Sequence, residues 1–235
     1  MKVEVLVDKD ALAETASNFL LEEIRKHAKL LLCAATGNTP IGTYKKLSEK
    51  LKSDQAEKIR LLKLDEWGGI FMAHPESCEQ YLQESLIKPL KISKDRYFSF
   101  ESDPNNPELE IKRMQKILDR EGPIDLCVLG LGANGHLAFN EPADQLIPHC
   151  HIADLSSASM QHSMAQAMEE KPTYGLSLGM ADILQSKTIV ILISGKHKRA
   201  ITKAFLSQKI STQLPASFLW LHPRTYCFLD QEAFG

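Results

Sequence analysis

The sequence predicts an α/β fold: one doubly wound, mostly parallel sheet with helices on both faces, of the Rossmann-like type. Short aliphatic runs alternate along the chain with longer amphipathic segments, which is the rhythm of β-α-β units. The runs LCVLGLG (126–132) and TIVILIS (188–194) are almost continuously apolar, as in strands covered on both faces. The chain has 235 residues and no internal repeat or proline-rich linker, so we expect one domain over residues 1–235.

The individual elements follow from the same pattern. Aliphatic and β-branched runs predict strands at residues 3–7, 29–34, 59–64, 124–130, 188–194 and 217–221, with a further core strand at 226–228. Apolar residues at helical spacing predict helices at residues 10–27, 40–51, 107–120, 179–185 and 196–207. The helix over 107–120 is the best defined, because Asn106 can cap its start and Gly122 can end it.

Composition excludes several classes of protein. With 28 basic and 30 acidic residues, the net charge of −2 gives no general attraction to nucleic acid or to an anionic membrane. The five cysteines are odd in number and widely spaced, which argues against a disulfide framework and fits a reducing compartment. No stretch approaches the roughly 18 apolar residues that span a bilayer, and the N-terminus does not resemble a signal peptide. We therefore expect a cytoplasmic globular protein.

The loop after the second predicted strand has the composition of a phosphate-binding loop. In Ala35-Thr36-Gly37-Asn38-Thr39-Pro40, the glycine allows close backbone approach, and the hydroxyls and the following helix start supply donors for one anion. Thr39 can also cap that helix, with Pro40 in its first turn. No Gly-Lys-Ser/Thr follows, so a small phosphomonoester is favoured over a nucleotide. The alternative is an ordinary strand-to-helix turn.

The third predicted strand ends in Asp65-Glu66-Trp67. These adjacent carboxylates are expected at the mouth of the cleft, and one of them, partly desolvated beside apolar surface, could act as a general base. The alternative interpretation is a solvated strand end.

The segment Gly130 to Pro142, GLGANGHLAFNEP, is the most specific motif. It lacks the third glycine of a dinucleotide-binding loop, and no long helix follows it. His136 is instead flanked by glycines, with Gly132 and Gly135 expected among the substrate-binding positions. Glu141 could orient the imidazole and tune its pKa. The segment therefore predicts an acid/base pair, although an isolated histidine is often structural.

Two further segments contain candidate ligands. The loop 194–199, SGKHKR, follows a buried strand and opens a helix, so its amides and a lysine, of which we choose Lys198, can converge on the same phosphate. His149-Cys150-His151 has alternating potential zinc ligands but no third or fourth ligand at a convincing spacing, so the start of a short strand is the favoured interpretation. We expect no metal and no cofactor.

Together these motifs resemble a known superfamily. The segments TGNTP, KLDEW followed by HPES, GLGANGHLAFNEP and SGKHK occur in the order found in the glucosamine-6-phosphate deaminase/6-phosphogluconolactonase superfamily. The resemblance covers essentially the whole chain. HPES and NEP are similar to the deaminases. Trp67, the segment CHIADLSSASMQH and PASFLWLHP, which contains Trp220, look closest to the galactosamine-6-phosphate deaminase/isomerase branch.

The resemblance implies a role for each matching position. Asp65 matches the base that moves a proton between C2 and C1, His136 the ring-opening group, and Glu141 its supporting carboxylate. Asn134 stands where some deaminases have aspartate, which would make the histidine depend more on Glu141. The phosphate site matches Thr36, Gly37, Asn38, Thr39 and Lys198. A phosphate-site arginine of some deaminases has no match here, and only Gln161 and His162 are plausible polar substitutes.

The expected reaction follows from these matches. Galactosamine 6-phosphate would be opened, isomerised and deaminated to tagatose 6-phosphate and ammonia. Glucosamine 6-phosphate is the alternative substrate. 6-Phosphogluconolactone hydrolysis and non-catalytic sensing of a sugar phosphate are less favoured functions. The expected partner is the small phosphorylated amino sugar, with a homo-oligomer possible.

Overall fold

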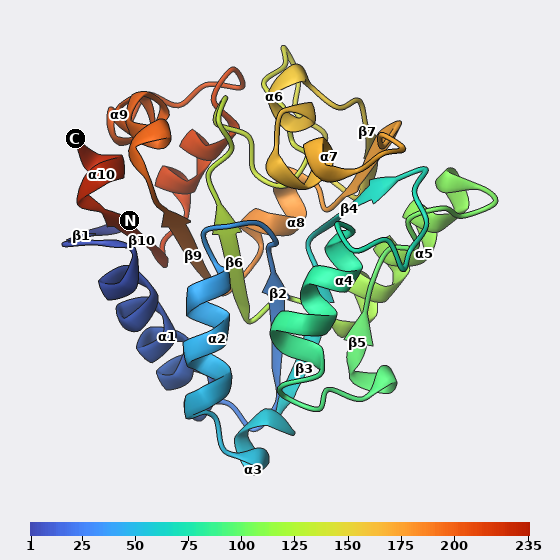
Figure 1. Ribbon diagram of the computed structural model, residues 1–235, viewed down its shortest axis with the longest axis horizontal. Coiled ribbons are helices and arrows are strands. Elements are labelled where there is room, and N and C mark those ends of the chain that lie inside the picture. Colours follow the sequence, from blue (N-terminus) through green and yellow to red (C-terminus); the bar gives the residue numbers. More distant parts are fainter.

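A parallel sheet of seven strands forms the centre of the protein. The computed structural model describes residues 1–235 (Figure 1). In spatial order the strands are β1 (Lys2–Leu6), β10 (Thr225–Asp230), β9 (Thr188–Ile193), β6 (Leu126–Gly130), β2 (Leu30–Ala34), β3 (Ile59–Lys63) and β5 (Tyr97–Phe98). Every neighbouring pair is parallel. This confirms the predicted doubly wound α/β fold.

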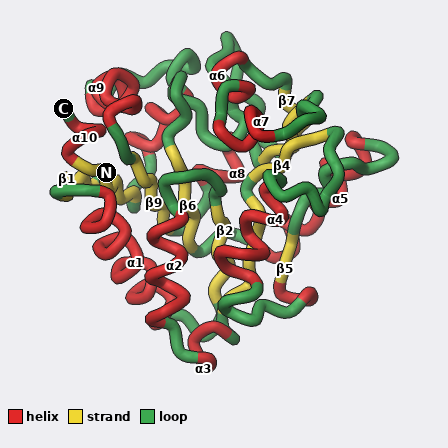
Figure 2. The backbone as a smooth tube through the Cα atoms, viewed as in Figure 1, coloured by secondary structure: helices red, strands yellow, loops and turns green.

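Helices cover both faces of the sheet (Figures 1 and 2). They are α1 (Lys9–Lys26), α2 (Ile41–Lys50), α3 (Ser53–Ala56), α4 (Cys78–Leu82), α5 (Pro107–Glu121), α6 (Ser157–Met160), α7 (Ser163–Ala167), α8 (Met180–Leu184), α9 (Arg199–Leu206) and α10 (Gln231–Phe234). A π-helical turn, Gln83–Ile87, continues α4, and 3₁₀ turns lie at Lys94–Arg96, Lys196–Lys198 and Pro215–Leu221. No helix is both long and apolar enough to cross a membrane.

Side-chain alternation along the strands builds two cores. In β2, Leu30 and Leu32 belong to the core under α1, α2 and α4, whereas Leu31 and Cys33 belong to the core under α5, α8 and α9. Because successive strand residues point to opposite faces, a strand buried on both sides must be apolar at every position. The continuous apolar runs in the sequence therefore predicted these central strands correctly.

Most predicted boundaries agree with the structure to within one or two residues. The helix predicted at 107–120 is α5, where the Asn106 side chain accepts a hydrogen bond from the Leu109 amide and Gly122 follows the last turn. The segment 226–228 lies in β10, as predicted. The helix predicted from residue 196 begins as a 3₁₀ turn and becomes α-helical at Arg199.

Two local predictions were wrong. The segment 217–221 is not a strand but part of the 3₁₀ helix Pro215–Leu221, because β10 already occupies the position beside β9. There the Trp220 indole donates to the Phe205 carbonyl at 2.8 Å, which holds the apolar run against α9. Thr39 does not cap α2, since Pro40 occupies the cap position and no side chain accepts a hydrogen bond from that helix start.

A second, antiparallel sheet was not predicted. Its strands, in spatial order, are β4 (Asp65–Gly68), β8 (Tyr174–Ser177) and β7 (His151–Ala153). The chain leaves β3 at Lys63 and enters β4 at Asp65, so the Asp65 backbone pairs with Ser177. The small sheet therefore holds Asp65 at the carboxyl edge of the large one.

The strand order creates a crevice between β2 and β6. From β2 the chain continues outward to β3 on one side, whereas β6 has β9 on its other side. Connections that leave in opposite directions open a space at the carboxyl ends of the strands, where doubly wound proteins bind ligands. The loops after β9, β6, β2 and β3 lie side by side there, near α6 and α7 at the top of Figure 1.

Candidate active site

A cavity of about 840 Å³ occupies this crevice. Its walls come from the four loops predicted to carry chemistry and from residues of α6 and α7. Thr36, Gly37, Asn38, Thr39, Asp65, Gly132, His136 and Lys198 all line it. Loops that are about 25 to 70 residues apart in sequence meet because their parallel strands are neighbours.

Asp65 contributes an unpaired carboxyl group to this cavity. Its Oδ1 is shielded from solvent and has no hydrogen-bond partner. Burial, and secondarily the negative charge of Glu66, raises the pKa of Asp65 to about 7, against a smaller opposing effect of Lys63. A carboxyl group with this pKa can both accept and return a proton near neutral pH.

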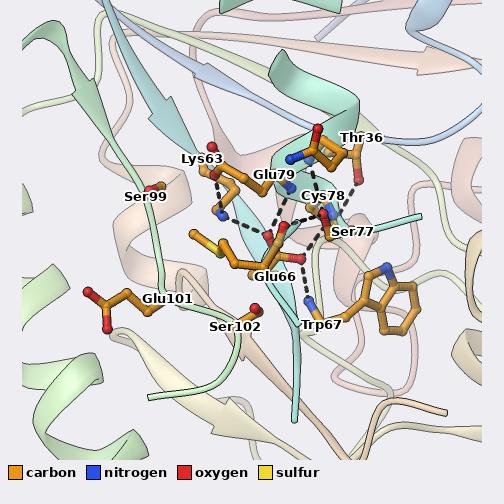
Figure 3. Close-up of polar contacts among 12 residues, drawn as sticks. Thr36, Lys63, Glu66, Trp67, Ser77, Cys78, Glu79, Ser99, Glu101 and Ser102 are labelled. Carbon is orange, nitrogen blue, oxygen red and sulfur yellow. Dashed lines mark hydrogen bonds and ion pairs between the residues drawn. The ribbon is translucent and has the colours of Figure 1, made fainter. Parts of the chain in front are cut away.

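The neighbouring carboxylate does not share the cavity, contrary to expectation. Glu66 is fully buried and points away from Asp65, because successive strand residues face opposite sides. Its Oε2 pairs with Lys63 Nζ at 2.6 Å (Figure 3). Trp67 is also buried and lines the cavity, where its ring packs against Phe139. Of the DEW segment, only Asp65 supplies an acidic group to the cavity.

His136 and Glu141 form the predicted pair. The His136 Nδ1 lies 3.2 Å from Glu141 Oε2. Burial opposes ionisation of Glu141, but hydrogen bonding to and the charge of His136, together with hydrogen bonds from Ser159 and Asn134, lower its pKa to about 2. An ionised carboxylate only accepts hydrogen bonds, so the Nδ1 carries a proton and the Nε2 is the ring nitrogen available to a ligand.

Asn134 and Ser159 hold this carboxylate in place. Asn134 Nδ2 donates to Glu141 Oε2 at 2.8 Å, and its Oδ1 accepts from the His136 amide at 3.2 Å. Ser159 of α6 donates its hydroxyl proton to Glu141 Oε1. Neither Asn134 nor Glu141 lines the cavity, so both reach it through His136.

The two glycines near His136 have different surroundings. A Cβ on Gly132 would lie 2.2 Å from the His136 ring, so only glycine leaves room for the imidazole in this position. Gly135 has φ +90° and lies beneath Leu214, outside the cavity wall. Gly135 was expected to bind substrate, but the structure places it in the turn behind His136.

The two predicted phosphate loops both line the cavity. Gly37 and Gly195 have φ of +103° and +94°, a backbone conformation that favours glycine. Asp230, at the end of β10, accepts hydrogen bonds from the Ser194 hydroxyl at 2.6 Å and from the Gly195 amide at 3.1 Å. Lys198 makes no ion pair within the chain, and burial lowers its pKa. An unpaired, partly buried cation indicates an anionic ligand.

His162 lies against the first phosphate loop. Its Nε2 is 3.3 Å from the point where a Cβ on Gly37 would be. The Met164 amide donates to the His162 Nδ1 at 3.3 Å, so the Nε2 carries the ring proton. Burial, with the charges of Lys198 and His136, lowers the pKa of His162. Gln161 lines the same wall.

Sequence reasoning missed four residues that contribute to the site. Ser159 and Asp230 are distant in sequence from the residues they hold, and nothing in their local pattern marked them. The buried pair of Lys63 and Glu79 was missed for the same reason. Of these, Ser159 and Lys63 lay in segments on which the family resemblance rested, CHIADLSSASMQH and KLDEW.

The histidines at 149 and 151 make other contacts. His149 Nδ1 lies 3.1 Å from Asp182 Oδ1, and His151 Nδ1 lies 3.0 Å from the His149 carbonyl oxygen. His151 begins β7, in agreement with the predicted strand start. No three His, Cys, Asp or Glu side chains gather in a way that could hold a metal ion.

The fold and the cavity define a class of protein: a doubly wound α/β protein whose anion-binding loops and acid/base groups surround one small-ligand site. The chain belongs to the family of glucosamine-6-phosphate isomerases and 6-phosphogluconolactonases, whose profile matches residues 7–227. It is 41% identical over 222 residues, 94% of this chain and 88% of the relative, to the Escherichia coli (strain K12) protein named "Putative deaminase AgaI".

Other relatives cover the chain almost completely. The glucosamine-6-phosphate deaminase of Clostridium tetani (strain Massachusetts / E88) is 35% identical over 99% of this chain and 98% of its own length. The structure of a monomeric glucosamine-6-phosphate deaminase superposes with a TM-score of 0.92 at 31% identity, covering 99% of this chain and 98% of that one. The 6-phosphogluconolactonase of Thermotoga maritima shares the fold, with a TM-score of 0.79 at 20% identity over 98% and 99% of the two chains.

Proposed function

We propose that residues 1–235 form one amino-sugar-phosphate isomerase/deaminase domain, which converts galactosamine 6-phosphate and water to tagatose 6-phosphate and ammonia. One observation carries the proposal. A carboxyl group with a raised pKa and a histidine–carboxylate pair share a cavity with an unpaired lysine and two glycine-containing loops. The carboxyl group and the histidine–carboxylate pair suit proton transfer. The lysine and the two loops suit a phosphate group held at a fixed distance from the site of proton transfer.

The histidine acts first in this scheme. A pyranose hides its aldehyde, so a proton must move from the anomeric hydroxyl to the ring oxygen before isomerisation. His136 can accept and return that proton at Nε2, because ionised Glu141 holds the Nδ1 proton and stabilises the positive ring. Asn134 and Ser159 keep Glu141 ionised and oriented.

Asp65 acts on the open chain. It removes the proton from C2, which is acidic only beside the freed aldehyde, and returns a proton to C1. As C2 loses its proton, O1 takes up a proton from the ammonium group, and protonation of the resulting enol at C1 gives a ketose-side iminium at C2. Water adds to that carbon and ammonia leaves, so the atoms of the amino sugar and of one water molecule are conserved. C1 is reduced as C2 is oxidised, so no external oxidant or reductant is needed, and we propose that neither metal nor cofactor takes part.

The phosphate group is assigned to the far side of the cavity. Lys198, the amides and hydroxyls of Thr36 to Thr39, and the Nε2–H of His162 would surround it. His162 then supplies the donor that the missing arginine would otherwise provide. Binding energy at this remote group would position C2 beside Asp65.

The sugar epimer rests on similarity rather than on a contact. The galactosamine branch is favoured by the sequence resemblance at Trp67 and in CHIADLSSASMQH, and the 41% identity to a protein named "Putative deaminase AgaI" supports deamination. Trp67 lines the cavity, but Trp220 packs on Phe205 outside it and contributes nothing to the choice. Relatives named glucosamine-6-phosphate deaminases support glucosamine 6-phosphate as the second candidate. Cytoplasmic location and homo-oligomer formation remain predictions.

Ammonia release tests the proposal directly. Purified protein is given galactosamine 6-phosphate and glucosamine 6-phosphate separately, with hydrolysis of 6-phosphogluconolactone measured in parallel. Faster ammonia release from the galactosamine substrate is the expected result. Faster release from the glucosamine substrate would reverse the epimer. Lactone hydrolysis without ammonia would replace the deaminase with a lactonase, and no turnover of any of the three would favour a sensor.

A further inference from the structure

A buried cluster of charges lies directly behind Asp65. Lys63 and Glu66 are completely buried, and Glu79 of α4 is nearly so. Lys63 Nζ donates to Glu66 Oε2 at 2.6 Å and to Glu79 Oε2 at 3.0 Å (Figure 3). One ammonium group therefore faces two carboxylates, leaving a net negative charge in the core. Burying such groups costs free energy that apolar side chains of similar volume would not cost, so stability alone does not explain the cluster.

Glu66 ties two elements together through its carboxylate. It accepts hydrogen bonds from the backbone amides of Trp67, Cys78 and Glu79, each at 2.9 Å, in addition to the bond from Lys63. The first amide belongs to β4, and the other two are donors at the start of α4 that have no partner within the helix. One side chain therefore fixes the start of β4 against the start of α4.

The start of α4 in turn contacts the first phosphate loop. Cys78, its first residue, has its Sγ 3.3 Å from the Thr36 Oγ1 (Figure 3). Asp65 is the residue directly before Glu66. A continuous set of contacts thus runs from Asp65 through Glu66 and Cys78 to Thr36, and both ends of it line the cavity.

We propose that Glu66 is a positioning residue for the reaction, whose buried carboxylate holds the proton acceptor Asp65 and the phosphate-binding Thr36 loop at a fixed separation. This inference rests on the proposed function, because a fixed separation matters only if C2 and the phosphate of one substrate bind at these two places. A misplacement of about 1 Å at a proton-transfer site can cost on the order of 100-fold in rate.

The same carboxylate also acts on Asp65 through its charge. After burial, the charge of Glu66 is the largest cause of the raised pKa of Asp65, and Lys63 opposes it. The other titratable groups that interact with Asp65 are Cys33 of β2, Tyr44 of α2 and Cys78 of α4. Burial raises the pKa of all three, so they are neutral at physiological pH. Lys63 and Glu66 therefore provide the charges that act on Asp65.

Two matched variants separate positioning from packing. Glu66→Gln and Glu79→Gln each remove one carboxylate from Lys63, but only the first also disturbs the amides of Trp67 and Cys78. We expect Glu66→Gln to lower kcat for ammonia release by on the order of 100-fold and to move the acid limb of the kcat/KM profile to lower pH. Glu79→Gln should lower kcat only a few-fold, roughly the variation expected from altered packing, and should leave that limb in place.

Measurements on the wild-type enzyme separate the proposed function from the positioning role of Glu66. If it releases no ammonia from either amino sugar, the proposed function fails. If it is active and both variants lose kcat equally with no movement of the acid limb, the positioning role of Glu66 is overturned.

Should Glu66→Gln not fold, the double variant Lys63→Met/Glu66→Gln removes the ion pair as a unit, and Glu79 keeps its hydrogen bonds from Tyr97 and Gln83. Folding is checked by circular dichroism and thermal unfolding. Reduced kcat with a lower acid limb in the folded double variant supports the proposal. Turnover equal to that of the wild type at every pH contradicts it.

Discussion

Asp65→Asn should stabilise the protein while abolishing its activity. In the folded chain the pKa of Asp65 is raised from 3.8 to about 7. The folded state therefore binds this proton more tightly than the unfolded state, and folding loses stability as pH rises from about 4 to about 7. At about 1.4 kcal/mol for each pH unit, the ionised group costs about 4 kcal/mol above pH 7 and about 1.5 kcal/mol at pH 5. Asparagine has nearly the same shape and no charge.

The assay is urea unfolding of wild type and Asp65→Asn at pH 5 and pH 8.5. We expect the variant to be more stable than the wild type, with an advantage that grows from about 1.5 to about 4 kcal/mol between these two pH values. Ammonia release should fall by at least about 1,000-fold, because the amide cannot take up the C2 proton.

The pH dependence is the decisive part of this result. An advantage of equal size at both pH values would show that Asp65 is not held in a desolvated site. Retained turnover would remove Asp65 from the proton transfer. Ser177→Ala, beside Asp65 in the small sheet, serves as a neutral control whose stability effect should not vary with pH.

The remaining predictions concern His136, its neighbours and the phosphate site. Glu141→Gln should reduce kcat by about 100-fold or more on the cyclic substrate, and much less on an open-chain analogue; equal losses on both would contradict ring opening by His136. Gly132→Ala should lower kcat by on the order of 100-fold, because a Cβ would meet the imidazole ring at 2.2 Å, and a crystal structure with an unmoved ring would refute this reason. His162→Asn keeps the cap of α7 but removes the Nε2 donor, so it should raise KM by about 10-fold or more and leave thermal stability unchanged. His162→Gln should leave KM unchanged and lower thermal stability. The opposite pattern would assign His162 to capping alone.

Local sequence was sufficient to predict an element when the caps and the apolar pattern of that element lay within its own segment. The helix α5 combines an asparagine cap, a proline in its first turn, an apolar face and a glycine after its end, and it was predicted almost to the residue. The central strands were predicted because burial on both faces requires an apolar residue at every position. The glycine-containing loops followed these strands directly, so their meeting at one edge could be foreseen from the parallel sheet.

Tertiary structure decided what depends on neighbours distant in sequence. The run at 217–221 has the composition of a strand but forms a 3₁₀ helix, because β10 takes the available edge of β9. The strands of the small sheet have only three or four residues, too few for a periodic pattern to register. The alternation of side chains along a strand separates its residues into two faces, but it does not show which face lies toward the ligand.

Asp65 and Glu66 show most clearly which features the sequence determines and which the tertiary structure determines. Their sequence showed that two carboxylates follow a strand at the expected mouth of a cleft, and that one of them could act as a general base. It did not show which carboxylate enters the cavity, because that depends on the pairing of β4 with β8 and on Lys63, Cys78 and Glu79 behind it. Residue type and order determined the kind of chemistry available to this chain. The packing of strands and helices from distant segments decided which groups are desolvated, which are paired, and which one is left free to exchange a proton.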